Sequence, residues 1–229
     1  MSSEEALIQI ENLEFSYGKL LPNVIRIPEL RIARGESVFL HGPSGSGKTT
    51  LLGLLAGVLQ SRKGKLRILG SDLGTLDSRG RDRFRGDHLG YIFQMFNLIP
   101  YLSVVENIAL PCSLSPRRNA KLGAESPHEA ARRLSAGLGI ESLLDKKVTE
   151  LSVGQQQRVA AARALIGSPE LVIADEPTSA LDFDHRERFI ELLFKESRRA
   201  GSTVLFVSHD RQLMPLFSRA VSLQEINQA

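Results

Sequence analysis

The sequence predicts an α/β fold with a mainly parallel core sheet flanked by helices. Three short, almost wholly apolar runs, at residues 90–93, 171–174 and 203–207, suit central strands that are covered on both faces. A fourth run, at 37–41, leads into a glycine-rich loop and then into a helix. Strand-like runs disappear between residues 98 and 167, which predicts a helical subdomain inserted into the α/β core.

Shorter signals define the other elements. Turn residues at Tyr17-Gly18 and at Pro22 separate two strand-like segments near the N-terminus. Two later segments rich in Ala, Leu and Arg favour helices. In chain order we expect strands at 7–15, 23–27, 37–41, 65–69 and 220–223, helices at 48–57, 129–138 and 155–166, and an irregular surface segment at 113–127.

Composition narrows the class of protein. Of 229 residues, 42% are hydrophobic and 24% charged, and the net charge is +3, which is ordinary for a globular protein. No basic run exceeds two residues, so no nucleic acid is expected as a partner. Cys112 is the only cysteine, which excludes an intrachain disulfide and a cysteine-based zinc site.

The sequence also bears on location. The N-terminus lacks the basic start and apolar core of a signal peptide. No apolar run approaches the roughly 20 residues that span a bilayer. We therefore expect a cytoplasmic protein that reaches a membrane only through a partner.

Residues 42–49, Gly-Pro-Ser-Gly-Ser-Gly-Lys-Thr, fit the phosphate-loop pattern G-x-x-x-x-G-K-[ST] between a strand and a helix. Backbone N–H groups of such a loop cradle phosphates, Lys48 places a positive charge at the β and γ oxygens, and the Thr49 hydroxyl can coordinate Mg²⁺. The alternative is a glycine-rich turn followed by Lys-Thr by chance. The residues expected to bind nucleotide here are Gly42, Ser44, Gly45, Ser46, Gly47, Lys48, Thr49 and Thr50.

An acidic pair follows the apolar run at 171–174. Asp175 stands where a carboxylate would hold Mg²⁺, and Glu176 stands where a carboxylate could accept a proton from water attacking the γ-phosphate. Ligands collect at this end of the strands in open α/β sheets. Without a phosphate loop, the same pair would more often belong to a loop or a helix cap.

Residues 151–158, Leu-Ser-Val-Gly-Gln-Gln-Gln-Arg, have the character of a second phosphate-binding half. Ser152 can act as a helix N-cap and as a hydroxyl donor to phosphate, and Gly154 permits close approach of a backbone. The helix that begins here would aim its positive end at the phosphate. The alternative is an ordinary capped helix.

Together these motifs resemble the ATP-binding cassette of an ABC transporter, over about residues 7–223. The resemblance implies a P-loop NTPase ABC cassette that forms a single ATP-binding domain over 1–229. It implies a RecA-like core with an N-terminal antiparallel β subdomain, at about 1–97 and 165–229. An inserted α-helical subdomain is expected at about 98–164.

The resemblance implies roles for residues that mean little alone. Tyr17 matches the aromatic that stacks on adenine, although by itself it could be a half-buried strand residue. Gln94 matches the glutamine that reaches Mg²⁺ or the attacking water. His209 matches the switch histidine that donates to the γ-phosphate, although a lone histidine at a strand end is usually structural. Asp182 matches the loop that crosses a dimer interface.

In this family Ser152, Gly154 and Gln155 contact ATP held by the opposite subunit, so the resemblance implies an ATP-dependent homodimer. It implies an ATPase that uses ATP and Mg²⁺, with Glu176, His209 and Gln94 as catalytic residues and with Thr49, Gln94 and Asp175 at the metal. Val153 departs from the commonest motif, which has glycine there.

The segment 91–111 is similar to the lipoprotein-releasing and macrolide-exporting branch, although Ser179-Ala180 departs from the Gly-Asn often found there. That branch implies an integral membrane permease with few transmembrane helices and a large extracytoplasmic domain, on whose cytoplasmic face the chain would sit. Pro100 and Tyr101 are the expected permease contacts. The alternatives are an importer ATPase, a soluble ABC ATPase not coupled to transport, and a non-hydrolysing dimerisation module.

Overall fold

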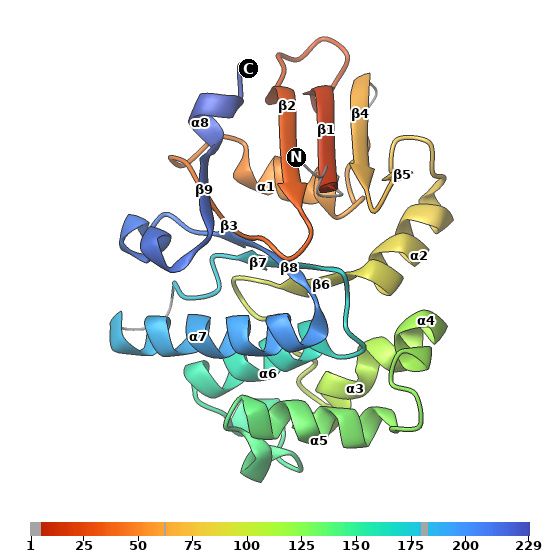
Figure 1. Cartoon of the computed structure of the whole chain (residues 1–229), viewed down its shortest axis with the longest axis vertical. Coiled ribbons are helices and arrows are strands. Elements are labelled where there is room, and N and C mark those ends of the chain that lie inside the picture. The colour runs from red at the N-terminus through yellow and green to blue at the C-terminus, as the bar shows by residue number, and fades with distance from the viewer. Residues whose placement is uncertain (1–5, 62, 180–182) are drawn as a thin grey trace, which may run out of the picture. The chain divides into compact units, whose positions relative to one another are not determined.

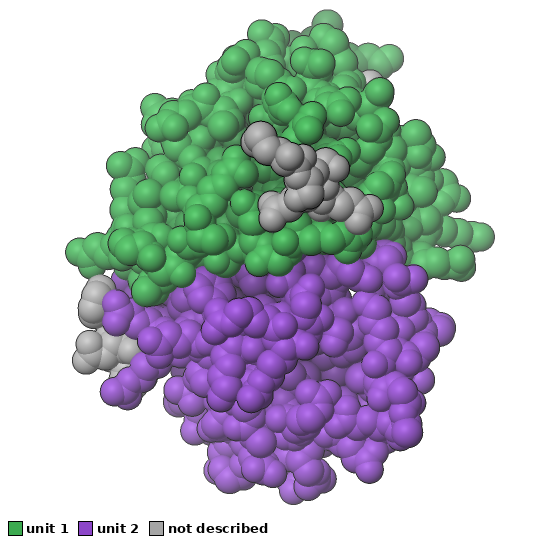
Figure 2. Space-filling view, viewed as in Figure 1, with its two compact units in different colours: residues 1–85, 205–229 green, residues 86–204 purple. Residues whose placement is uncertain are grey.

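The computed structural model describes residues 6–61, 63–179 and 183–229, without the side chains of 183–185. The chain divides into two compact units (Figure 2). Unit 1 comprises Met1–Arg85 and Leu205–Ala229, and unit 2 comprises Gly86–Val204. No described helix has the length and apolar character needed to cross a membrane.

Unit 1 contains an antiparallel sheet with the strand order β2-β1-β4-β5 (Figure 1). Its strands are β1 (Ala6–Phe15), β2 (Ile25–Ala33), β4 (Lys63–Ile68) and the short β5 (Ser71–Asp72). Apolar and polar residues alternate along β2 except at Pro28-Glu29, so its isoleucines and Leu30 are buried while Arg26, Pro28, Glu29 and Arg31 are exposed. The antiparallel β subdomain expected near the N-terminus is present, and β2 extends beyond the predicted 23–27.

The parallel strands of unit 1 carry the phosphate loop. β3 (Ser37–His41) pairs in parallel with β9 (Arg219–Ser222), and β8 (Thr203–Val207) is the other neighbour of β3. The helix α1 (Lys48–Leu55) follows the loop, and the short helix α8 (Leu223–Ile226) follows β9.

A buried aromatic cluster supports these strands. The ring centroid of Phe39 lies 6.2 Å from that of Phe206 and 5.2 Å from that of Phe217. Phe39 and Phe206 are fully buried, so the end of β3 that leads into the loop stands on a packed base.

Unit 2 contains one parallel strand pair and most of the helices. β6 (Leu89–Ile92) pairs with β7 (Leu171–Asp175) in the register Leu89↔Leu171. Gly90 is required in β6, because a Cβ there would lie 2.2 Å from the carbonyl oxygen of Ala164. The helices are α2 (Ser78–His88), which begins in unit 1, α3 (Val104–Leu114), α4 (Pro116–Ala120), α5 (Pro127–Gly137), α6 (Val153–Leu165) and α7 (Phe183–Ala200), with 3₁₀ turns at Glu141–Leu143, Val148–Glu150 and, in unit 1, Arg211–Leu216.

The prediction of an irregular segment at 113–127 was wrong in part. α3 extends to Leu114, and α4 begins at Pro116. Ser115 caps α4 by accepting a hydrogen bond from the N–H of Arg118, and Pro116 occupies the first helical position, where its missing N–H costs nothing. The Ser-Pro pair that suggested a loop therefore starts a helix. The two helices predicted at 129–138 and 155–166 are confirmed as α5 and α6.

Candidate functional site

The phosphate loop ends in a helix that has no side-chain cap. Gly47 is the N-cap of α1 and has φ 96°, a left-handed conformation that suits glycine. No side chain accepts a hydrogen bond at this cap. A helix leaves its first N–H groups without partners inside the helix, so the start of α1 is a positive surface suited to an anion.

The Lys48 side chain folds back onto the first residues of this loop. Its ammonium donates to the carbonyl oxygens of Gly42 at 2.7 Å and Pro43 at 2.9 Å. An ammonium has three N–H donors, so these bonds fix its position and leave a donor for a ligand. Thr49, the next residue, has an exposed side chain at the start of α1.

The predicted nucleotide-binding residues Ser44 and Gly45 are exposed on the same loop. Ser46 is less open, and its hydroxyl oxygen is buried without a hydrogen-bond partner among the described residues. A Cβ at Gly42 would lie 2.7 Å from that oxygen, so a side chain there would displace the Ser46 hydroxyl. Because most residues of the loop are glycine or serine, the loop offers mainly its backbone to a ligand.

The hydroxyl and the ring of Tyr17 each have a partner, while much of the side chain is exposed to solvent. Its hydroxyl is hydrogen-bonded to the Thr50 hydroxyl at 3.0 Å, and its ring meets Phe15 edge-on at a centroid distance of 5.1 Å. The side chain is 62% exposed. A hollow of about 550 Å³ opens beside it, lined also by Asn23 and Gln60, which is within the size range of small-molecule sites.

His209 belongs to the same edge of unit 1. Ser208, just past the end of β8, donates its backbone N–H to the carbonyl of Leu40 near the end of β3. The two strands therefore end at the same level, and His209, whose side chain is exposed, leaves the sheet where the phosphate loop begins.

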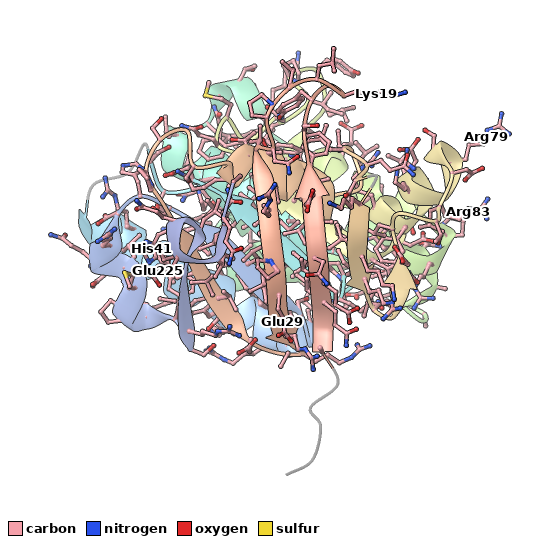
Figure 3. The ribbon with its side chains drawn as sticks, turned by 90° about the horizontal axis from the view of Figure 1, so that it is seen from above. Lys19, Glu29, His41, Arg79, Arg83 and Glu225 are labelled. Atoms are coloured by element: carbon pink, nitrogen blue, oxygen red, sulfur yellow. The ribbon has the colours of Figure 1, made fainter. Side chains whose placement is uncertain are left out.

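His41, the last residue of β3, lies beneath the start of this loop and is only 8% exposed. Burial lowers the pKa of its imidazole, the positive charge of Arg211 lowers it further, and Glu225 opposes both. Figure 3 shows His41 and Glu225 side by side.

In unit 2, the predicted metal ligand Asp175 and the predicted catalytic residue Glu176 leave the sheet together with Gln94. The register Ile92↔Ala174 brings both strands to the same level, and Gln94 and Glu176 each follow two residues later. Glu176 has φ 47°, which is uncommon for a residue other than glycine. Such backbone outliers cluster at functional sites.

Tyr91 contacts the acid at the end of β7. Burial raises the pKa of the Tyr91 phenol, and the negative charge of Asp175 and a hydrogen bond to it raise the pKa further. The phenol therefore stays protonated and donates to the Asp175 carboxylate.

The backbone after Gln94 is held by α6, the signature helix, which begins within the signature motif at residues 151–158. Phe96 and Asn97 have φ values of 59° and 47°, so this segment makes a tight left-handed turn. Arg163, on α6, donates to the carbonyl oxygens of Asn97 at 2.7 Å and of Phe96. Burial lowers the pKa of Arg163 from a value so high that the guanidinium stays charged.

The signature helix α6 begins with a complete capping box. Ser152 is the N-cap, its hydroxyl accepts from the N–H of Gln155 at 3.4 Å, and the Gln155 side chain accepts from the N–H of Ser152 at 2.9 Å. The predicted N-cap role of Ser152 is confirmed. Val153, at the first helical position, is 47% exposed, and Gly154 follows it.

The three consecutive glutamines of this motif make different hydrogen bonds. Gln155 completes the capping box, and Gln156 donates to the carbonyls of Val148 and Leu151. Gln157 is 1% exposed and donates to the carbonyl of Pro177 at 2.8 Å, directly after Glu176. The helix thus fixes the backbone beside the predicted catalytic acid.

The structure groups the predicted residues in two sets. Unit 1 carries the phosphate loop, Tyr17 and His209, and unit 2 carries Gln94, Asp175, Glu176 and the signature motif. Asp182 lies outside the described residues. Arg163, Gln157 and Tyr91 were missed, because no local pattern distinguishes a side chain that binds a carbonyl or a carboxylate distant in sequence.

Comparisons with known proteins agree with this arrangement. The family described as ABC transporter matches residues 25–179. The chain is 38% identical to the uncharacterized ABC transporter ATP-binding protein YbbA of Escherichia coli K12, covering 96% of this chain and 95% of that one. It is 35% identical to the lipoprotein-releasing system ATP-binding protein LolD of Porphyromonas gingivalis, covering 96% and 97%.

A solved structure gives the same result. The dimeric post-hydrolysis state of the ATP-binding cassette MJ0796, bound to ADP and Pi, aligns with a TM-score of 0.82 and 33% identity over 97% of each chain. The predicted cassette fold is confirmed, and so is the resemblance to the lipoprotein-releasing branch. The chain belongs to the ABC transporter family and is an ATPase of that family.

Proposed function

We propose that this ATPase binds MgATP at the phosphate loop and drives a membrane permease by ATP-dependent homodimerisation and hydrolysis. The uncapped start of α1 carries the proposal, because its free N–H groups and the fixed Lys48 ammonium form a ready anion site. Tyr17 would stack on adenine, since its exposed ring is tied to Thr50 in the first turn of α1. Thr50 would thereby join the base-binding and phosphate-binding parts of unit 1.

The residues present suit Mg²⁺. No group of three or more His, Cys, Asp or Glu side chains in the described part of the chain could hold a metal ion. Mg²⁺ needs no such cage, because it is usually bound by one or two protein oxygens, waters and substrate phosphates. Thr49, Gln94 and Asp175 would supply these oxygens, with Tyr91 orienting the Asp175 carboxylate. When bound, Mg²⁺ neutralises charge on the phosphate oxygens.

Hydrolysis is assigned to Glu176, which would accept the proton of the attacking water, while His209 donates to the γ-phosphate and Gln94 positions the water. Glu176 has a left-handed backbone conformation, and the Gln157 bond to the Pro177 carbonyl fixes the chain directly after it. We expect Glu176→Gln to keep ATP affinity within about twofold and to slow turnover by about 10²-fold or more. Near-normal ATPase activity in that variant would refute the assignment.

The signature helix would complete the site of a second copy. Ser152 already accepts a bond from Gln155, but a hydroxyl has one donor besides its two acceptor positions, so it can still donate to phosphate. Gln155 and Gly154 would lie against the same phosphate. ATP would bridge two subunits, and hydrolysis would remove the bridge.

The permease would dock on the segment after Gln94, and the protein would lie on the cytoplasmic face of the membrane through it. Large apolar side chains are exposed there and at the end of α3: Met95 by 81%, Tyr101 by 77% and Leu114 by 74%. Such side chains suit an apolar helix from a partner. The likeness to LolD favours a permease of the lipoprotein-release, export or force-transmitting type.

Docking can be tested separately from catalysis. The double variant Pro100→Ala, Tyr101→Ala should lose co-purification with the permease encoded alongside it and keep basal ATPase activity. Unchanged co-purification would refute this docking surface.

A further inference from the structure

The segment that follows α8 holds the phosphate loop from outside. The Asn227 side-chain oxygen accepts a hydrogen bond from the N–H of Arg26 at 2.7 Å. Its side-chain nitrogen donates to the carbonyl of Val24 at 3.0 Å and to the carbonyl of Ser46 at 3.3 Å. One amide group therefore joins the start of β2 to the middle of the phosphate loop.

The bond to Ser46 fixes the orientation of a peptide that the ligand needs. In a trans peptide, the C=O and N–H groups point in opposite directions. The described peptide bonds are all trans, so the Ser46 carbonyl faces Asn227 and the Gly47 N–H faces away from it. Gly47 is the N-cap of α1, and its N–H belongs to the row of amides at the start of that helix.

The segment that carries Asn227 is attached to β2 by further contacts. The backbone N–H of Gln228 donates to the carbonyl of Arg26 at 2.8 Å, and α8 contacts β2 (Figure 1). Ile25 is fully buried beside the loop, and a Cβ at Gly47 would lie 2.9 Å from its side chain. Asn227 therefore fixes the phosphate loop relative to the start of β2.

We propose that Asn227 is a positioning residue for nucleotide phosphates. It holds the Ser46–Gly47 peptide so that the Gly47 N–H points at the β-phosphate, and it does not touch the nucleotide itself. The inference rests on the proposed assignment of this loop to the phosphates.

Two neighbouring residues allow a matched comparison. Asn227→Asp keeps the acceptor for the Arg26 N–H but places a carboxylate oxygen against the carbonyls of Val24 and Ser46. Gln228→Ala keeps its only described bond to β2, because that bond uses the backbone. Asn227→Ala removes all three side-chain bonds and serves if the aspartate variant does not fold.

The experiment measures ADP and AMP affinity by calorimetry, with thermal unfolding as the check on folding. Loss of one positioning hydrogen bond corresponds to about a three- to tenfold change in affinity. We expect ADP affinity to fall by that factor in Asn227→Asp and Asn227→Ala, and by less than twofold in Gln228→Ala. AMP lacks the β-phosphate, so its affinity should change by less than twofold in all three.

Unchanged ADP affinity in the folded Asn227 variants would overturn the proposal, and so would an equal loss for AMP and ADP. Lys48→Ala separates this outcome from failure of the proposed function. If ADP binding does not depend on Lys48, the phosphate assignment itself is wrong. If it depends on Lys48 but not on Asn227, only the positioning role is wrong.

Discussion

The two helices that begin at the predicted phosphate-binding motifs differ in how the N–H groups of their first turn are hydrogen-bonded. α1 starts at Gly47 with no side-chain cap, whereas α6 starts at Ser152 with both bonds of a capping box. The α1 loop is instead held through its carbonyls, by Lys48 and Asn227. The Ser46 N–H donates to the Pro43 carbonyl within the loop, and the amides at the start of α1 are left for a ligand.

This difference indicates a division of labour. An N-terminus without a cap gains most from an anion, because the anion supplies the missing hydrogen bonds. An anion stabilises a capped N-terminus less, because the capping side chains already accept hydrogen bonds from some of its N–H groups. We therefore expect the phosphate loop to bind nucleotide in a single chain, and the signature helix to add to binding only when a nucleotide is already held by another copy.

Lys48→Ala should have the largest effect. It removes the cation that closes the loop and that we propose faces the phosphates, and a bond to a charged group is worth up to about 3 kcal/mol. We expect about a 100-fold loss of MgATP affinity in calorimetry. Lys65→Ala, which removes an exposed lysine from β4, is the control and should bind normally. A loss below about threefold in Lys48→Ala would contradict the division of labour.

Ser152→Arg should separate dimerisation from binding. The bulky cation would occupy the start of α6, so ATP-dependent dimers should disappear in sedimentation experiments. ATP affinity of the monomer should stay within about twofold, because the phosphate loop is untouched. If equilibrium measurements showed affinity and dimerisation falling together, the two helix ends would not act on different subunits.

Ser152→Ala should separate the cap from catalysis. Ser126 caps α5 with an equivalent box, in which Glu129 plays the part of Gln155. Ser126→Ala and Ser152→Ala should each lower the free energy of unfolding by about 1 kcal/mol. Only Ser152→Ala should also lower ATPase activity, by about tenfold, because it removes the hydroxyl that we propose donates to phosphate. Equal activity in the two variants would leave Ser152 with a capping role alone.

Val153 should have a smaller influence. Its side chain is 47% exposed at the start of α6, next to the surface proposed for the second copy. Val153→Ala removes bulk without adding the backbone freedom of glycine, and we expect the ATP-dependent dimer to tighten by about two- to threefold. Weaker dimerisation in sedimentation would show that valine contributes to the interface.

His41 should have the smallest effect, on the acid stability of the phosphate-loop unit. Its pKa is below 6.5 in the folded protein, chiefly through burial, whereas the unfolded chain takes up a proton near 6.5. Stability is therefore full above pH 6.5 and declines as the pH falls through the lower, folded-state pKa.

The His41 prediction is checked by thermal unfolding at pH 7.5 and 5.5. His41→Asn should lose less stability between these values than the parent protein. The same change at His128, which is exposed on α5, should leave the pH dependence unaltered. If the stability of His41→Asn depended on pH as that of the parent protein does, burial would not oppose protonation of the His41 imidazole.

Local signals predicted much of the fold. β3 and β8 have the predicted bounds, because each is a compact apolar run between turn signals. α2 was not predicted, since only Phe84 is buried along it and no apolar periodicity marks it. The Ser-Pro pair at 115–116 is as compatible with a helix start as with a loop, and only the tertiary structure decides between them.

The same limit applies to the site. The motif residues could be predicted because their spacing is local. Arg163, Gln157 and Asn227 bind backbone carbonyls that are at least 20 residues away in sequence. Nothing near them in the sequence points to those carbonyls, so their part in the site follows only from the fold.

The central claim is that one nucleotide is held by α1 of one copy and α6 of the other. Two proteins test it: one carries Lys48→Ala and the other Ser152→Arg, and both carry Glu176→Gln to prevent hydrolysis. Neither homodimer has a complete site, but a heterodimer has one, formed by the intact loop of the second protein and the intact signature helix of the first. Sedimentation with MgATP should show dimers in the mixture and only monomers in each protein alone. A mixture that stays monomeric, or dimers of the Lys48→Ala protein alone, would contradict the account.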